Sequence, residues 1–461
     1  MLYNISWYYR CLIAVLFIGA LIASHPVLAQ MKSEEAGQAS ATLSLDEIIK
    51  LAKANNAVLK QAHLQTSRAG KQVAVARTKT QPQIGTYLLD SHQFDKPEIH
   101  VERGLLGEFP KLGAFPPNAV TFAESRQNSL YSLIALTYPI TRQRDIRTGI
   151  RMSEAARDIT EAREAQATLD VLCETKKLYC SILALKNAQI ANQTAIRLFS
   201  DYCSTIERLV REGYAQKADL FDVKARLAQA EARNESITLK CISLMETLSR
   251  LCGLDACNSL RLSALPEPTD DVATAVSDVA GAMPGHPLIR VGQFQKKLAN
   301  LDKELKKGEF RPNLTLTVDR LQGHRTAEYL PKQMSTAGLL VSWNPFDWGK
   351  RKHELEDKQM ACQQADLALA ETDKTVREAI RAAQRRVQEA RAQLTAARKK
   401  CDWAEEQARM FRNRLSEKAI LPKDLLEAEA QLAEAQFLRH QACLDVWIAQ
   451  AELEKALGDE L

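Results

Sequence analysis

Cysteines are the residues of this chain most able to do chemistry, because thiols form disulfides and bind soft metals. The chain has 10 of them, and Cys11 lies in a segment that we predict below to be removed. If the chain folds back near Gly213, Cys173 lies level with Cys252 and Cys257. A disulfide from Cys173 to one of these two is therefore a hypothesis. No Cys-x-x-Cys spacing indicates a zinc site, and the other thiols fit small buried hydrophobic residues, with a metal-relay role left open.

The remaining motifs give no sign of catalysis. The sequence contains no Gly-x-Gly-x-x-Gly, no P-loop and no His-Glu-x-x-His. Gly349-Lys350 lacks the earlier glycine of a phosphate loop, His353-Glu354 lacks its second histidine, and the 8 histidines are scattered. We therefore expect that the protein is not an enzyme and that it has no cofactor and no metal site.

The composition favours long helices. Of the 461 residues, 46% are apolar and 26% are charged, which excludes both a disordered chain and a helical protein with many membrane spans. Gly (18) and Pro (15) are scarce, as in helical proteins. The net charge of +5 is small and no long run of like charges occurs, so we expect no nucleic-acid partner.

Residues 1–29 are typical of a secretory signal peptide. Arg10 precedes the apolar run Cys11–Ala23, and Val27-Leu28-Ala29 fits a cleavage site. The apolar run is too short to span a bilayer, although an uncleaved N-terminal anchor is the alternative. We therefore expect the mature protein to leave the cytoplasm.

The rest of the chain is an internal duplication. Glu212–Gly253 matches Glu417–Gly458 at an offset of 205 without a gap, and further upstream the offset is 230, so that Pro82 matches Pro312. The first copy therefore carries about 25 extra residues, and we expect an irregular loop over Ser91–Asn128. The pattern predicts a first repeat at 30–265 (helix, β-hairpin 82–138, helical hairpin 145–253), a linker at 266–287, and a second repeat at 288–461 (helix, β-hairpin 312–343, helical hairpin 350–458).

The helical hairpins have a coiled-coil pattern. From Val376 to Leu415 small or apolar residues recur in alternating steps of four and three, and the returning run from Leu425 to Ala456 does the same, interrupted at Arg439. Such a seam favours left-handed supercoiling of packed helices. A run of about 65 residues reaches about 100 Å, a length that suits a spacer or a tube.

Alternating residues predict strands. Leu314, Leu316 and Val318 point to one face, and Asn313 and the intervening threonines point to the other. Two hairpins give four strands with open edges, which lipid does not tolerate, so several protomers would have to close a barrel together. Hairpins that cover a helical core are the alternative. Four aromatic residues near the strand ends would form an interfacial girdle: Tyr138, Trp343, Phe346 and Trp348.

These features together resemble the TolC-type outer-membrane efflux protein family, over about Leu43–Gly458. Asn55-Asn56 stands where the family usually has Asn-Pro. The other segments that carry the resemblance are Leu43–Ile49, the prolines Pro82 and Pro312, Asn344–Arg351, Ala218–Val223 and Lys423–Ala428.

The resemblance implies a mainly α protein with a small β part. Three protomers would form a homotrimer with one twelve-stranded barrel in the outer-membrane lipid of a Gram-negative-type bacterium. A helical tube would extend from this barrel into the periplasm. The resemblance also implies two partners, which are a periplasmic adaptor (membrane fusion) protein and an inner-membrane pump of the RND or ABC type.

The resemblance further implies an acidic gate at the periplasmic tip. Asp424 and Glu427 occupy the positions of the family's constriction, and three copies would form a ring of carboxylates that favours cations. The alternative is two solvated acids that the helix dipole stabilises. Lys418–Pro422 departs from the family's glycine turn and basic latch. The matching tip of the first repeat contains Gly213, Asp219 and Asp222.

The favoured function is therefore the exit duct of a tripartite efflux system, which passively conducts small molecules from the pump and adaptor to the cell exterior. A duct for type I protein secretion is the main alternative, and heavy-metal export is a third. From another class, a soluble periplasmic coiled-coil scaffold would explain the helices but not the strands and their aromatic ends.

Overall fold

The computed structural model describes residues 42–458, with gaps at 93, 95–97, 124–127, 214–215, 255–260, 269–284, 326–331 and 417–421. Residues from Thr42 onward belong to one unit. The predicted signal peptide at 1–29, most of the predicted linker, and Cys257 lie outside the described residues.

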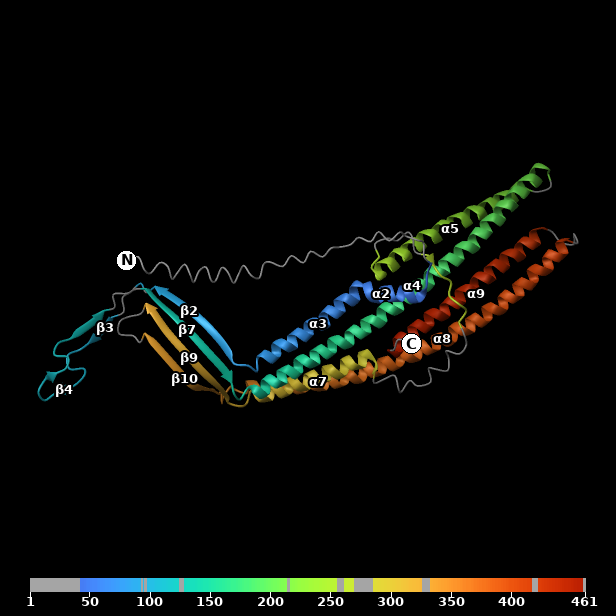
Figure 1. The fold of residues 1–461 in the computed structure, drawn as a ribbon. Coiled ribbons are helices and arrows are strands. Elements are labelled where there is room, and N and C mark those ends of the chain that lie inside the picture. Colours follow the sequence, from blue (N-terminus) through green and yellow to red (C-terminus); the bar gives the residue numbers. More distant parts are fainter. Residues whose placement is uncertain are drawn as a thin grey trace. The chain divides into compact units, whose positions relative to one another are not determined.

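Long helices make up most of the described chain (Figure 1). In the first half they are α2 (Leu45–Asn55), α3 (Ala57–Thr78), α4 (Gln143–Arg211) and α5 (Lys217–Cys252). In the second half they are α7 (Pro287–Gly308), α8 (Lys350–Ser416) and α9 (Pro422–Leu457). α4 packs along α5 and α8 along α9, while α4 also contacts α3, α7 and α9. The predicted class, mainly helical with a small β part, is confirmed.

The first helix begins where its sequence specifies. Ser44 and Glu47 form a capping box, in which the Ser44 hydroxyl accepts the Glu47 N–H at 3.3 Å and the Glu47 carboxylate accepts the Ser44 N–H at 2.8 Å. The Ser44 N–H and the Ser44 hydroxyl, which also donates to this carboxylate at 3.0 Å, lower the pKa of the Glu47 carboxyl. α2 ends at Asn55, and the side chain of the next residue, Asn56, caps the following helix, α3.

The predicted coiled-coil seam is the core between α8 and α9. Ile380, Cys401 and Val446 are at most 1% exposed. Alanines such as Ala404 and Ala435 alternate with larger seam residues and are equally buried, which lets the two axes approach closely. Arg439 interrupts the seam as predicted.

Four long strands form one antiparallel sheet. They are β2 (Gln83–His92), β7 (Asn128–Pro139), β9 (Asn313–Arg325) and β10 (Gln333–Ser342), in the spatial order β10-β9-β7-β2. The central β7–β9 pair joins the two halves of the chain. Among the described residues, no strand pairs with the outer edge of β2 or of β10.

The expectation of an irregular loop over Ser91–Asn128 is wrong. This segment contains two antiparallel pairs, β3 (Glu98–Val101) with β6 (Val120–Ala123) and β4 (Glu108–Phe109) with β5 (Gly113–Ala114). β-Branched residues such as Ile99 and Val120 favour strands, and such local pairs close short loops. The described part of the extra segment therefore contains paired strands between β2 and β7 in the sequence.

Candidate functional site

One face of the sheet is apolar in the half of the strands that lies nearest the helices. The pairing places Leu316 opposite both Tyr138 and Leu339, and Leu314 opposite Val341. We call this set the apolar face: Ile84, Leu136, Tyr138, Leu314, Leu316, Val318, Leu339 and Val341. Ile84, Leu339 and Val341 are 71%, 61% and 63% exposed, so no described element of this chain covers them. An apolar environment outside the chain would therefore stabilise this face.

The other face is polar over the same strand halves. Thr317 lies opposite Thr137 and Gly338, and Thr315 lies opposite Leu340. Beyond Asp319 the pattern reverses, because the pair Leu133–Leu321 lies on the polar side. The apolar face is thus continuous in the strand halves that adjoin the helices and is interrupted beyond them, where Arg320 and Ser132 lie on the same face as Ile134 and Leu88.

Three of the four predicted girdle aromatics lie where β10 passes into α8. Trp343, Phe346 and Trp348 are 60%, 67% and 88% exposed. The Phe346 and Trp348 rings meet edge to face at 4.8 Å between centroids, and Trp348 has the positive φ of 55° that side chains rarely adopt. Tyr138, the fourth, lies on the apolar face. The structure thus puts exposed aromatics at this end of the sheet, and the girdle itself stays a prediction.

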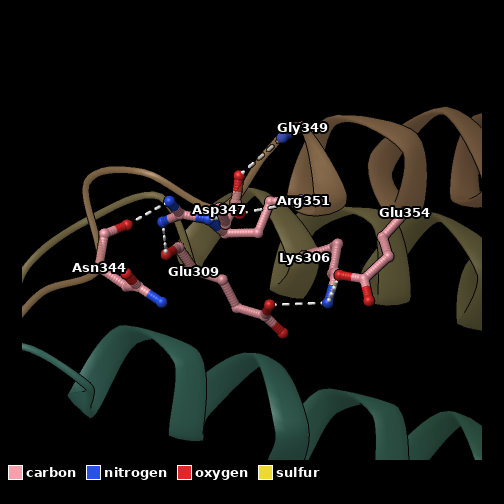
Figure 2. Close-up of polar contacts among 7 residues, drawn as sticks. All are labelled: Lys306, Glu309, Asn344, Asp347, Gly349, Arg351 and Glu354. Atoms are coloured by element: carbon pink, nitrogen blue, oxygen red, sulfur yellow. Dashed lines mark hydrogen bonds and ion pairs between the residues drawn. The ribbon is translucent and has the colours of Figure 1, made fainter.

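An arginine fixes the path of the chain from β10 into α8 (Figure 2). Arg351 donates to the Glu309 carbonyl at 3.1 Å, to the Asn344 carbonyl, and to the Asp347 carboxylate. The Asp347 carboxylate also accepts the N–H groups of Gly349 and Arg351 at 3.2 Å. These donors, above all the Arg351 side chain, lower the pKa of Asp347. One planar guanidinium thus joins the end of α7, the end of β10 and the start of α8.

A lysine adds a second connection at this junction. Lys306 of α7 lies 2.7 Å from the carboxylates of both Glu309 and Glu354, as Figure 2 shows. These two hydrogen bonds raise the pKa of Lys306, and the one with Glu354 lowers the pKa of that carboxyl. The strand-to-helix junction therefore holds its position through several charged contacts rather than one.

Toward the helical tips, a cavity of about 780 Å³ separates α4 and α5 from α9. It brings together two of the predicted tip acids, Asp222 and Glu427, which are equivalent at the offset of 205. Arg226 on α5 donates to Asp222 at 3.0 Å. The aromatic residues that line this cavity are Phe199, Tyr202 and Phe437.

The rest of the predicted gate is not among the residues and side chains that the structure describes. Asp219 and Asp424 lie in α5 and α9, but their side chains are not among those described, nor is the turn 417–421. Gly213 follows the end of α4 with φ of 79°, as a residue that ends a helix. Glu427 is exposed. The acidic gate stays a prediction.

The sequence interpretation missed three charged residues of this cavity. Arg226 and Arg233 lie seven residues apart on α5, and Glu434 follows Glu427 by seven on α9. A spacing of seven places residues on the same side of a coiled-coil helix, which is the signal that could have found them.

The disulfide hypothesis is wrong for Cys173 with Cys252, because both are free thiols in the structure, while the other partner, Cys257, lies outside the described residues. The Cys252 Sγ faces α2, 4.0 Å from the Ile48 carbonyl oxygen, whereas Cys173 lines a cavity beside Ala451 and Lys455 of α9. The sequence argument predicted how far along the hairpin each thiol lies, but it could not predict on which face of its helix each thiol lies. Burial raises the pKa of both.

No group of three or more His, Cys, Asp and Glu side chains among the described residues could hold a metal ion. No helix in the described part is both long and apolar enough to cross a membrane.

The chain is similar in fold to outer-membrane channels of known structure. The outer membrane protein VceC from Vibrio cholerae matches with a TM-score of 0.72 at 16% identity, covering 90% of this chain and 96% of that one. The CmeC outer membrane channel of Campylobacter jejuni gives 0.72 at 16%, covering 90% and 85%. The open-state MtrE outer membrane channel of Neisseria gonorrhoeae gives 0.69 at 17%, covering 90% and 89%.

Sequence comparison gives the family itself. No curated protein sequence is detectably similar to this chain. The family model described as "outer membrane efflux protein", however, matches residues 48–254 and 282–459, which is most of the chain. This chain therefore belongs to the outer membrane efflux protein family.

Proposed function

We propose that this chain is the exit duct of a tripartite efflux system, which passively conducts small molecules from an inner-membrane pump and a periplasmic adaptor to the cell exterior. The observation that carries the proposal is the four-stranded sheet, which has an exposed apolar face and two outer strands whose outer edges pair with no described strand. Membership of the family supports the same reading.

The open strands argue for a homotrimer. β2 and β10 each have 10 residues, so each outer edge leaves a row of backbone N–H and C=O groups without a strand. Lipid cannot satisfy these groups, whereas the β10 edge of one copy can pair with the β2 edge of the next. Three copies would close a twelve-stranded barrel with the apolar face toward lipid and the threonine side toward the lumen.

The helices would form the periplasmic part of the duct. α4 has 69 residues and α8 has 67, so each spans about 100 Å. Packed in three copies, the two helical hairpins would line one tube that continues the barrel. The far tip, where Glu427 lies, would then be the end that meets the adaptor and the pump.

The gate proposal places the acids of α9 at the narrowest point. Asp424 and Glu427 from three copies would form carboxylate rings that favour cations. The cavity beside Glu427 supports movement there, because it leaves space between α9 and the hairpin of α4 and α5. Arg226 and Arg233 line the same cavity and would attract Glu427 and Glu434 if α9 moved toward them.

Membrane fractionation followed by mass determination of the detergent-extracted oligomer tests the duct. We expect the protein in the outer-membrane fraction as a trimer. A water-soluble monomer or dimer would overturn the proposal, and the sheet would then be a cap on a periplasmic coiled-coil scaffold.

Single-channel recording in planar bilayers tests the gate. Asp424→Ala combined with Glu427→Ala is expected to raise the conductance or to reduce the preference for cations, because the carboxylate rings are gone. The equivalent pair in the first repeat, Asp219→Ala with Asp222→Ala, is the matched control and is expected to change both quantities less. Unchanged conductance and selectivity in the first variant would exclude this gate.

A further inference from the structure

The two repeats each contain the same contact between the start of one helix and the end of another. In the first repeat, the Asn56 side-chain oxygen accepts the N–H of Val58 at 2.8 Å at the start of α3. Its amide nitrogen donates to the Leu251 carbonyl at 2.9 Å, near the end of α5. Asn56 is 2% exposed. One buried side chain thus caps a helix and holds the end of the returning helix, and we call this contact the clasp.

In the second repeat a histidine forms the clasp. His286 matches Asn56 at the offset of 230, and Ala456 matches Leu251 at the offset of 205. The His286 Nδ1 accepts the N–H of Leu288 at 3.2 Å at the start of α7, and the ring hydrogen bonds with the Ala456 backbone near the end of α9. His286 is 3% exposed. A donor to the carbonyl and an acceptor for the amide require the neutral ring with its proton on Nε2.

A glycine lets the helix end approach each clasp. A Cβ on Gly253 would lie 2.9 Å from the Asn55 Cβ, and one on Gly458 would lie 2.8 Å from the His286 Cδ2. Both glycines have positive φ, 64° and 78°. The two clasps therefore share their geometry and differ chiefly in the chemistry of the capping side chain.

We propose that the second clasp is a proton-sensitive contact and the first is not. Acid would then loosen the start of α7 and the end of α9, while the start of α3 and the end of α5 stay fixed. An amide has no proton to gain in this range, so the Asn56 clasp is independent of pH. A proton on the His286 Nδ1 removes the acceptor for Leu288 N–H and places a cation at a helix N-terminus, where the dipole opposes it.

The charged groups around His286 do not favour a cation there. The cavity beside it, about 360 Å³, is lined by Arg386 of α8 and by Glu452 and Lys455 of α9. Glu452 is already paired with Arg386 at 3.2 Å and with Lys177 of α4 at 2.7 Å. Lys455 pairs with Asp170 of α4 at 2.9 Å. The nearby acids are therefore engaged, and a new charge on His286 would add to two cations.

Burial lowers the pKa of His286 from its ordinary value, and the hydrogen bond with Ala456 opposes this only in part. The free ring therefore binds a proton more readily than the clasped ring. The contribution of the clasp to stability is complete above the ordinary pKa of about 6.5 and declines as the pH falls below that value toward the lowered pKa. At pH 5 the open fraction can rise by at most about 30-fold, since the free ring is then about 97% charged.

The consequence for conduction rests on the proposed function. α9 contains both the predicted gate acid Glu427, near its start, and the residues that contact His286, at its end. Loosening that end would therefore free the helix that lines the tip. Acid would then act on the second helical hairpin and leave the first one unchanged.

Hydrogen exchange of the whole protein in detergent, followed by mass spectrometry, tests the clasp. After division by the intrinsic exchange rates, we expect protection of residues 287–292 to fall several-fold between about pH 7.5 and about pH 5. His286→Asn copies the first repeat and is expected to remove this fall. Asn56→His is expected to create the same fall at residues 57–62.

The outcome is decisive in either direction. A fall of equal size in His286→Asn would overturn the proposal, as would protection in the wild type that is constant over this range. If His286→Asn does not fold, ¹⁵N NMR of the wild-type histidines decides, with His286→Gln for assignment: a protonated Nδ1 at neutral pH, or a pKa at or above about 6.5, contradicts the clasp. Exchange reports the clasp whatever the chain conducts, so failure of the duct proposal would be seen separately.

Discussion

At the scale of single residues, the distance to neighbouring atoms decides whether a helix end tolerates a side chain in place of glycine. Gly458 follows α9 with φ of 78°, directly against His286 and Pro287. A side chain there meets both a strained backbone and a steric clash. Gly70, within α3, has ordinary helical geometry and nothing within 4 Å of a Cβ added to it. The same substitution should therefore have opposite effects at the two positions.

We expect Gly458→Ala to lower the free energy of unfolding by about 2 kcal/mol or more, from the left-handed backbone together with the clash. Gly70→Ala is the control and should be neutral or raise it by up to about 1 kcal/mol, because alanine favours the helix. Thermal unfolding followed by circular dichroism measures both. Equal effects of the two substitutions would contradict the close approach at Gly458.

Arg439 is the residue of the α9 seam that does not fit its surroundings. Its Nε is buried and has no hydrogen-bond partner among the residues that the structure describes. We expect Arg439→Met to raise the free energy of unfolding by about 1 kcal/mol, because an apolar side chain of similar length removes the unsatisfied group. Arg409→Met, at a side chain that is 71% exposed, is the control and should change stability by less. A loss of stability in the Arg439 variant would show that the arginine contributes to the fold.

At the scale of elements, the passage from β10 into α8 depends on directional hydrogen bonds. Arg351 reaches two carbonyls and one carboxylate from three different nitrogen atoms. Each end of the junction comes from a different element, α7, β10 or α8. The guanidinium therefore sets the angle at which the second helical hairpin leaves the sheet, which charge alone does not fix.

Arg351→Lys keeps the charge but cannot make these three contacts at once. We expect it to lower the free energy of unfolding by about 1–2 kcal/mol, since it leaves at least one carbonyl without its donor. The exposed neighbour Lys352, replaced by Arg, is the control and should have no effect on stability. Chemical denaturation measures the difference, and equal stability of the wild type and Arg351→Lys would mean that charge is sufficient.

At the scale of the whole molecule, a single copy leaves the four-stranded sheet open among the described residues. Residues of its apolar face such as Ile84 and Val341 are exposed, and the outer edges of β2 and β10 pair with no strand of the described chain. Leu339 and Leu340 are neighbours in β10 with similar exposure, 61% and 57%, and they point to opposite faces. In the proposed barrel, this pair would separate lipid contact from lumen contact with the same chemical change.

Leu339→Lys is expected to reduce strongly the amount of trimer in the outer-membrane fraction, because a charge on the lipid face costs up to about 2–4 kcal/mol in each copy. Leu340→Lys faces the threonine side and should assemble nearly as well as the wild type. Quantification of the extracted trimer compares them. Equal assembly of the two variants would argue that the apolar face does not contact lipid.

The sequence by itself determined the features that repeat locally. Steps of four and three predict the seam that buries Ile380 and Cys401, because a helix turns by a fixed angle per residue. Alternation predicts the face shared by Leu314 and Leu316 for the same kind of reason. The offset of 205 matches Asp222 with Glu427, although it does not say that they line one cavity.

The tertiary structure decided what joins residues far apart in the chain. Asn56 and Leu251 are separated by 195 residues, and no sequence pattern around either residue predicts their contact. The level of Cys173 along its hairpin was predictable, but the face on which it lies depends on which helices pack against α4. Such contacts follow from the relative rotation of whole helices, and local periodicity does not encode that rotation.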